Sequence, residues 1–170
     1  KDTRALTAIA SDAGAPSRLV EATVAVNEDR KSRMAERIIA QAGGSVQGKT
    51  VGVLGLTFKP DTDDMREAAS LPILAHLHDA GARIQAFDPE GMEPARALLP
   101  DGVIYCEDAL EAATDADILV VLTEWNVFRA IDPDRLSKAM RGKAIADLRN
   151  IWNPATMRAA GFDYSSIGRI

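Results

Sequence analysis

Hydrophobic and polar positions change their spacing once along the chain. Before about residue 45 the apolar residues recur at helical spacing, and after Gly48 short apolar runs alternate with amphipathic segments. The first part predicts a helix from Thr3 to about Ala13 and a longer helix from Ser17 to about Gln41, which Gly43-Gly44 ends.

The longer of these two helices has an unusually polar middle. It would span roughly 40 Å at about 1.5 Å per residue. The stretch from Asn27 to Arg33 is almost wholly polar, so only the ends have obvious apolar partners, which favours an exposed connector between domains. Ser17 is placed to cap this helix, and Asp2 or Thr3 to cap the shorter one.

The second pattern, after Gly48, is typical of an α/β protein. Strands are expected near Thr50–Leu56, Arg83–Phe87, Val103–Cys106, Ile118–Leu122, Lys143–Asp147 and Tyr164–Ile167, and helices near Ser70–Ala80, Met92–Leu99, Ala109–Ala113, Asp134–Met140 and Pro154–Ala160. Buried strands that alternate with helices predict a doubly wound parallel sheet, Rossmann-like, with strand order 3-2-1-4-5-6. We therefore divide the chain into a helical segment, residues 1–45, and a sheet domain, residues 46–170.

Composition excludes several classes of function. The chain has 170 residues and a net charge of −5, so no broad basic surface is expected for nucleic acid. No apolar run approaches the roughly 20 residues that cross a bilayer. The single cysteine, Cys106, ends a predicted strand and is interpreted as a small buried hydrophobe in a cytoplasmic protein. His76 and His78 would point to different faces of one helix, so no metal site is expected.

Candidate chemistry lies in the segment that follows the first predicted strand. Lys59 and Arg66 supply two cations where ligands bind in open α/β sheets, at the carboxyl ends of the strands. Three acidic residues between them, Asp61, Asp63 and Asp64, could orient these cations or cap the next turn.

The same strand does not carry an ordinary dinucleotide fingerprint. Gly52 and Gly55 are not followed by a third glycine at the start of a helix, so a pyrophosphate would lack its usual helix terminus. Gly55 is interpreted as a close-packed turn residue. Asp88-Pro89 is interpreted as a strand terminator rather than a ribose-binding acid.

The segment Phe58-Lys59-Pro60-Asp61-Thr62-Asp63-Asp64, with Arg66-Glu67 after it, closely resembles a signature of the nucleotide-sugar dehydrogenases, the UDP-glucose/GDP-mannose dehydrogenase family. The match continues from Tyr105 and in Thr123-Glu124-Trp125 and Asp147-Leu148-Arg149-Asn150, and covers essentially the whole chain. These enzymes use NAD to oxidise nucleotide sugars to uronic acids, and this sequence looks like the UDP-glucose type.

The resemblance implies roles for five residues. Phe58, Lys59 and Arg149 would contact the UDP-sugar, and Arg66 would reach toward NAD carried by another domain. Asp2 would assist proton transfer and position water. The alternatives are solvated loop charges for Lys59 and Arg66, a pair with Asp147 for Arg149, and a helix cap for Asp2.

Three neighbours of these residues have open or structural interpretations. Trp125 is expected either to form an aromatic wall near the base or to cover the open end of the sheet. Asn150 and Trp152 are expected to shape a turn.

The resemblance also implies a catalytic residue and partners that would complete the enzyme. In the family a Gly-rich segment carries the catalytic cysteine in a Cys-Phe-Pro-Lys-Asp motif; this sequence opens at Lys1-Asp2, so the nucleophile is expected just before residue 1. The expected partners are a UDP-sugar, the N-terminal NAD-binding domain of the same protein, and a second copy through the helical segment. The alternatives are a dehydrogenase for another UDP- or GDP-sugar, a stand-alone nucleotide-binding module, or a purely structural dimerisation element.

Overall fold

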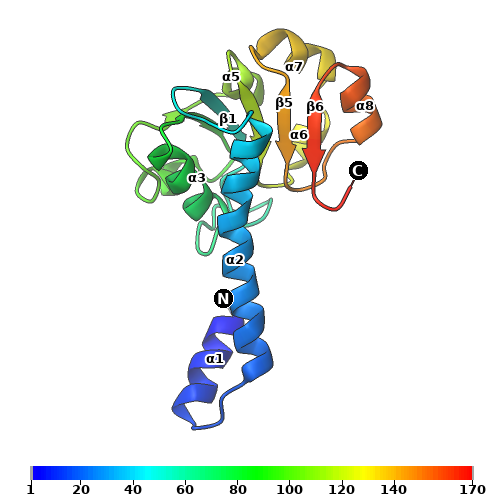
Figure 1. Cartoon of the computed structure of the whole chain (residues 1–170). Coiled ribbons are helices and arrows are strands. Elements are labelled where there is room, and N and C mark those ends of the chain that lie inside the picture. Colours follow the sequence, from blue (N-terminus) through cyan, green and yellow to red (C-terminus); the bar gives the residue numbers. More distant parts are fainter. Residues whose placement is uncertain (1, 170) are drawn as a thin grey trace.

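The fold is a six-stranded, all-parallel sheet with helices on both faces and a helical hairpin that projects from it (Figure 1). The computed structural model describes residues 2–169. The strands are β1 (Thr50–Leu54), β2 (Arg83–Phe87), β3 (Ile104–Tyr105), β4 (Ile118–Val121), β5 (Ala144–Asp147) and β6 (Asp163–Ser166). Their order is β3-β2-β1-β4-β5-β6, which confirms the predicted topology and places the switch point between β1 and β4.

The helices of the described residues follow the predicted pattern with one addition. They are α1 (Asp2–Asp12), α2 (Arg18–Gln41), α3 (Ser70–Asp79), α4 (Met92–Arg96), α5 (Ala109–Ala113), α6 (Asn126–Arg129), α7 (Pro133–Ala139) and α8 (Pro154–Ala159). The sequence did not predict α6, a single turn after β4. The cap predictions for Asp2 and Thr3 were wrong, because both lie inside the first turn of α1. Ser17 does occupy the N-cap position of α2, although its hydroxyl makes no capping bond.

Two apolar clusters hold the sheet between its helices. Ile73, Leu74 and Leu77 of α3 pack with Ile38 of α2 on one face, together with the inward residues of β1 and β4. On the other face α5, α7 and α8 pack around Phe128. Gly52 in β1 is required here, because a Cβ atom would lie 2.3 Å from the Ala112 carbonyl oxygen of α5.

The hairpin of α1 and α2 forms a stalk below the sheet (Figure 1). Helix α1 has no buried residue, and α2 buries only Ala35 and Ile38, near its carboxyl end. The outer part of the hairpin exposes four large apolar side chains, Leu6, Ile9, Leu19 and Val26. The last turns of α2 therefore share the core of the sheet, while the rest of the hairpin extends beyond it.

Candidate functional site

Asp88 fixes the loop that follows β1. Its side chain is fully buried at the end of β2 and accepts six hydrogen bonds. They include the backbone amides of Leu56 and Thr57, at 2.6 and 3.1 Å, and the indole N–H of Trp125, at 3.1 Å. The interpretation of Asp88 as a structural residue is thus supported, because a carboxylate with so many donors has no acceptor left for a ribose.

Close contact between the loops after β1 and β4 directs Phe58 outward. The Thr123 hydroxyl donates to the Thr57 carbonyl at 2.7 Å, and Gly55, with φ +89°, lets the two loops approach. A Cβ atom at Gly55 would lie 2.5 Å from the Cβ of Thr123. The charged loop is the part of the chain between β1 and α3, residues 55–69. Within it the Phe58 amide donates to the Asp64 carbonyl at 2.9 Å, and the Phe58 ring is left 52% exposed.

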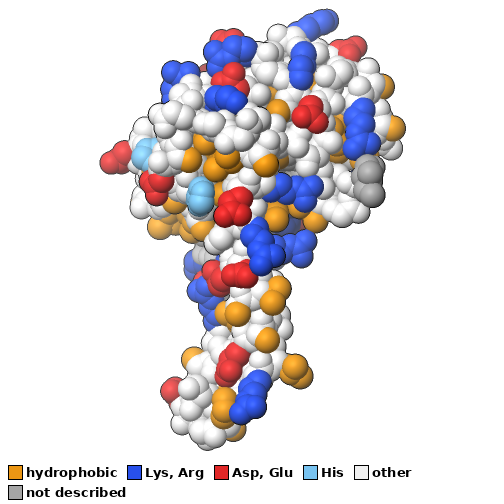
Figure 2. All heavy atoms as spheres, in the orientation of Figure 1, with side chains coloured by type: hydrophobic (Ala, Val, Ile, Leu, Met, Phe, Trp, Pro, Cys, Tyr) orange, Lys and Arg blue, Asp and Glu red, His pale blue; other side chains and the backbone are white. Residues whose placement is uncertain are grey.

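A pocket of about 450 Å³ lies at this edge of the sheet, between the carboxyl ends of the strands and the helical hairpin. Its lining includes apolar residues of the sheet domain and polar residues of both hairpin helices. The lining residues are Thr3, Arg4, Val24, Asn27, Glu28, Arg30, Lys31, Met34, Phe58, Glu67, Ala69, Ile73, Leu122, Leu148, Arg149 and Ile167. Lys and Arg side chains gather where the stalk meets the sheet domain (Figure 2). A pocket of this volume is in the range that holds small ligands.

Four charged groups on the stalk side of the pocket form one ion-pair network. Arg4 of α1 contacts Glu28 at 2.7 Å and Glu67 at 3.0 Å. Lys31 of α2 contacts the same two carboxylates, at 3.3 and 3.5 Å. The hydrogen bond from Arg4 lowers the pKa of Glu28. The network is electrically neutral and joins both hairpin helices to Glu67 of the charged loop.

Arg149 also lines the pocket, and it pairs with Glu124. This hydrogen bond also holds the pKa of Glu124 below its usual value. Pairing of Arg149 with Asp147 was the alternative from the sequence, and it was wrong for the guanidinium. Asp147 is fully buried and instead accepts from the Arg149 amide, from two further backbone amides and from the Tyr164 hydroxyl.

The structure brings together only part of the predicted site. Phe58 and Arg149 both line the pocket, whereas Lys59 and Arg66 do not. Lys59 is exposed on the loop beside Phe58. Arg66 is held by two parallel hydrogen bonds to Asp64, at 2.8 and 2.7 Å, and these raise the pKa of the guanidinium. Asp2 is exposed next to Thr3, which lines the pocket.

Other candidates from the sequence have structural positions. Trp125 is buried and bonded to Asp88, so it covers the end of the sheet rather than forming a wall of the pocket. Asn150 adopts φ +57° and exchanges two hydrogen bonds with Ile167, so it shapes the turn as expected. Trp152 is buried, with its indole N–H on the Phe128 carbonyl at 3.0 Å.

Two expected absences concern metals and membranes. Within residues 2–169 no group of His, Cys, Asp or Glu side chains is arranged to hold a metal ion. None of the described helices combines the length and apolar character needed to cross a bilayer.

Sequence reasoning missed the contribution of α2 to the pocket. The polar stretch from Asn27 to Arg33 was interpreted as an exposed connector, yet Asn27, Arg30 and Lys31 line the pocket. Their spacing of three and four residues places them on one face of a helix, but it does not show that this face meets the sheet domain.

The structure is that of a Rossmann-like α/β domain with a pocket, lined in part by Lys and Arg, at the carboxyl edge of its parallel sheet, which is where such domains bind ligands. Residues 52–154 match the family model described as the UDP binding domain of the UDP-glucose/GDP-mannose dehydrogenase family. The chain belongs to this family.

Relatives found by sequence include UDP-glucose 6-dehydrogenases. One from Rhizobium meliloti (strain 1021) is 52% identical over 99% of this chain and 38% of the relative. Another, TuaD from Bacillus subtilis (strain 168), is 38% identical over 99% of this chain and 36% of the relative. The chain thus spans less than two-fifths of the length of these proteins.

Solved structures agree with the sequence relatives. A UDP-glucose dehydrogenase from the hyperthermophilic archaeon Pyrobaculum islandicum superposes with a TM-score of 0.77 and 33% identity, over 91% of this chain and 34% of that one. A UDP-D-ManNAc dehydrogenase structure from Pyrococcus horikoshii has a TM-score of 0.76 at 23% identity, over 94% of this chain and 36% of that one, and supports the fold alone.

Proposed function

We propose that this chain is the UDP-sugar-binding part of an NAD-dependent UDP-glucose 6-dehydrogenase, which oxidises UDP-glucose to UDP-glucuronate in the cytoplasm. The observation that carries the proposal is the pocket in which Phe58 and Arg149 meet, within a chain whose residues 52–154 match the family's UDP binding domain. The relatives of 52% and 38% identity are UDP-glucose 6-dehydrogenases, which favours UDP-glucose over other nucleotide sugars.

In this proposal the ligand lies across the pocket with its phosphates toward the cations. Arg149 offers a planar, permanently charged donor that can bind a phosphate oxygen or a hydroxyl. Lys59 adds a second cation from the loop that carries Phe58. The exposed Phe58 ring gives the base or the sugar an apolar surface for stacking.

The proposed reaction is a four-electron oxidation of the sugar C6 alcohol in two steps, with a catalytic cysteine that holds the aldehyde as a thiohemiacetal and then a thioester. One NAD would serve as hydride acceptor for each oxidation when bound, and hydrolysis of the thioester would release the carboxylate. Cys106 does not fit the role of nucleophile. It is buried, and burial raises its pKa to about 11, so the reactive thiolate is scarce near neutral pH.

Residues 2–169 do not fit NAD in the way that a dinucleotide-binding sheet does. After β1 the chain enters the charged loop instead of a helix, and Asp88 has all its acceptor positions occupied. We therefore place NAD on the N-terminal domain of the same protein, with Arg66 reaching toward it.

Arg66 and Asp2 have separable roles in the complete enzyme. Arg66→Ala should raise the KM for NAD more than the KM for UDP-glucose, whereas Asp2→Asn should lower kcat with little change in the KM for UDP-glucose. Steady-state kinetics on both variants test the roles. A wild-type kcat for Asp2→Asn would remove Asp2 from the catalytic residues and leave it as an acidic residue in the first turn of α1.

We also propose that the helical segment, residues 1–45, joins two copies of the protein. The support is the number of large apolar side chains that the hairpin exposes, among them Leu6, Ile9 and Leu19. Sedimentation of wild type and of Leu19→Glu tests this, since a charge at the centre of an apolar contact should shift the mass toward the monomer. If wild type and Leu19→Glu sediment with the same mass, the hairpin is excluded as the contact between two copies.

The central experiment is a calorimetric titration of UDP into this chain. Lys59→Ala and Arg149→Ala should each weaken binding by about 1.5 kcal/mol or more, because each loses a charge-assisted contact. Arg33→Ala is the control, since Arg33 is paired with Asp29 and lies outside the pocket lining. Equal affinities for all four proteins would remove Lys59 and Arg149 from the site, and absence of any UDP binding would refute the proposed function.

A further inference from the structure

One wall of the pocket comes from outside the matched UDP binding domain. The family model covers residues 52–154, yet α2 contributes Asn27, Arg30 and Lys31 to the lining. Arg30 and Lys31 follow Asn27 by three and four residues, so the three side chains lie on one side of α2, which is turned toward the pocket. Any ligand in the pocket therefore meets side chains of the stalk as well as those of the sheet domain.

The cations of the pocket differ in what already holds them. Arg4 and Lys31 are each bound by both Glu28 and Glu67, and Arg149 is bound by Glu124. An anion that recruits one of these groups competes with a carboxylate. An anion therefore gains less binding free energy from one of these paired cations than from a cation that has no carboxylate partner.

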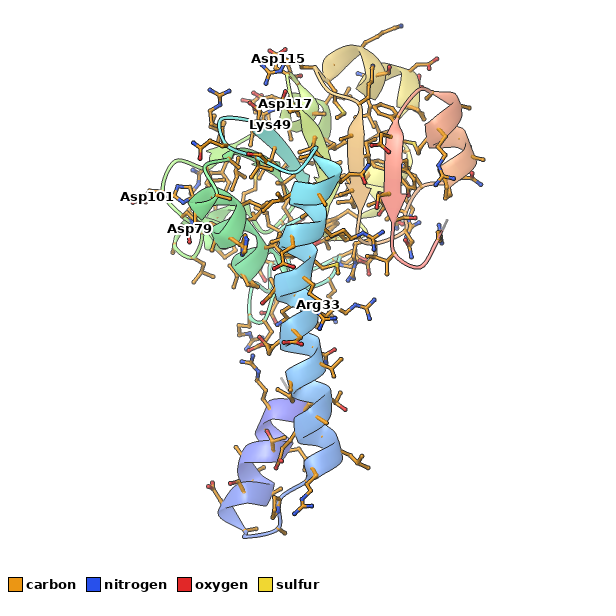
Figure 3. The ribbon with its side chains drawn as sticks, viewed as in Figure 1. Arg33, Lys49, Asp79, Asp101, Asp115 and Asp117 are labelled. Carbon is orange, nitrogen blue, oxygen red and sulfur yellow. The ribbon has the colours of Figure 1, made fainter. Side chains whose placement is uncertain are left out.

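Arg30 is the exception in the part of the chain that the structure describes. It lines the pocket, and its side chain makes no hydrogen bond or ion pair with any other described residue. Its guanidinium can therefore turn toward an anion without breaking an existing pair. Arg33, three residues further along α2, is instead 72% exposed and paired with Asp29 at 3.2 Å. Figure 3 shows Arg33 on α2, below the sheet domain.

We propose that Arg30 is a phosphate-binding residue of this pocket, which recognises the diphosphate of a nucleoside diphosphate from the stalk side. The inference rests on the proposed function and extends it to a helix that the family domain does not include. The floor of the pocket is apolar, with Ile73 and Leu122 buried beneath it, so the charged end of the ligand belongs at the rim with Arg30 and Arg149. A guanidinium suits this role because its donors match two phosphate oxygens at once.

The test compares Arg30→Gln with Arg33→Gln, two substitutions that remove the same charge from the same helix. UDP and uridine are titrated separately into each protein and into wild type, with binding followed by NMR. Arg30→Gln should weaken UDP binding by about fivefold to tenfold, because an exposed charge-assisted contact is partly screened. It should leave uridine binding unchanged and reduce the loss of UDP affinity with added salt. Arg33→Gln should bind both ligands as wild type does.

Four results decide the matter. UDP affinity that is equal in wild type and Arg30→Gln would remove Arg30 from the site while the proposed function stands. Equal weakening by both substitutions would show a diffuse charge effect and overturn the assignment. Weakening of uridine together with UDP would show a loss of pocket shape and would also overturn it. Failure of wild type to bind UDP would refute the proposed function itself, and the role of Arg30 with it.

Discussion

At the scale of single residues, the hydrogen bonds of Asp88 lead to a stability prediction. An amide at this position can keep at most one of the two acceptor oxygens. If the amide nitrogen of Asp88→Asn faces the amides of Glu90 and Gly91, the partly buried Glu90 donor and the buried Gly91 donor both lose their acceptor. Each such donor costs about 1–3 kcal/mol, so the free energy of unfolding should fall by about 2–6 kcal/mol.

Urea unfolding measures this change, and Asp101→Asn is the control, because Asp101 is exposed on a loop (Figure 3). The control should stay within about 0.5 kcal/mol of wild type. If Asp88→Asn and wild type unfold at the same urea concentration, the six hydrogen bonds of Asp88 do not stabilise the loop that follows β1.

The sequence predicts site residues well where a motif and a strand end coincide. Phe58 and Arg149 follow β1 and β5, and parallel strands bring these ends to one edge. Arg30 and Glu67 could not be predicted in the same way. Their place in the pocket depends on the direction in which α2 leaves the sheet, and a local pattern does not contain that direction.

At the scale of elements, helix α2 is buried near its carboxyl end and exposed near its amino end. Ile38 is fully buried against α3 and the sheet, whereas Leu19 is 86% exposed near the other end. Ile38→Ala should lower the free energy of unfolding by about 2–4 kcal/mol through the lost contacts and the cavity. Leu19→Ala should change it by less than about 0.5 kcal/mol in the monomer. Urea unfolding at low protein concentration makes the comparison, and equal losses for both variants would contradict this division of α2.

A second element-scale prediction concerns pH and the start of β1. Asp117 precedes β4 at the edge of the sheet remote from the stalk, near Lys49 (Figure 3). Its carboxylate accepts from the Thr50 amide at 2.8 Å and from the Arg141 guanidinium at 2.8 and 2.6 Å. Burial raises the pKa of Asp117, but the bonds from Arg141 and Thr50 outweigh it, and the pKa lies below its ordinary value.

A carboxyl group whose pKa is lower in the folded state than in the unfolded state makes the protein less stable as the pH falls. The stabilisation is complete above the unfolded pKa of about 3.9 and is lost as the pH falls through the folded pKa. Asp117→Asn should therefore reduce stability by about 1 kcal/mol near neutral pH, and the difference from wild type should shrink below about pH 4. Urea unfolding over this range tests it. If the difference in the free energy of unfolding between wild type and Asp117→Asn does not change with pH, the lost stability comes from packing rather than from the charge of Asp117.

The elements themselves were predictable for a physical reason. Strands such as Ile118–Val121 are buried on both faces and appear in the sequence as continuous apolar runs. Helix α6 was missed because Asn126–Arg129 is one turn long and held largely by the buried Phe128, so it has no period to detect. The edge strand β3 was predicted two residues too long, since only Ile104 and Tyr105 pair with β2.

At the scale of the whole molecule, binding and chemistry should separate. The pocket lies within the described chain, and saturating UDP at about 100 times its Kd should stabilise the folded state by about 2.7 kcal/mol. A thermal shift assay reads this as a higher Tm with UDP than with uridine, because uridine lacks the phosphates. A Tm that UDP leaves unchanged would contradict the presence of a complete UDP site on this chain.

The same molecule should reduce no NAD. The first oxidation, of the C6 alcohol, needs a bound NAD, and after β1 the described chain has a loop instead of the helix that would hold a pyrophosphate. The second oxidation, through a thioester, needs a thiolate, and Cys106 is buried with a pKa raised to about 11. Purified chain with UDP-glucose and NAD should therefore give no NADH absorbance above a blank without protein, and Cys106→Ser should give the same result. NADH formation by a sample that intact-mass measurement shows to contain only these 170 residues would mean that this chain has its own catalytic machinery. Its loss in Cys106→Ser would then identify the nucleophile, and its persistence would exclude Cys106 and point to another group.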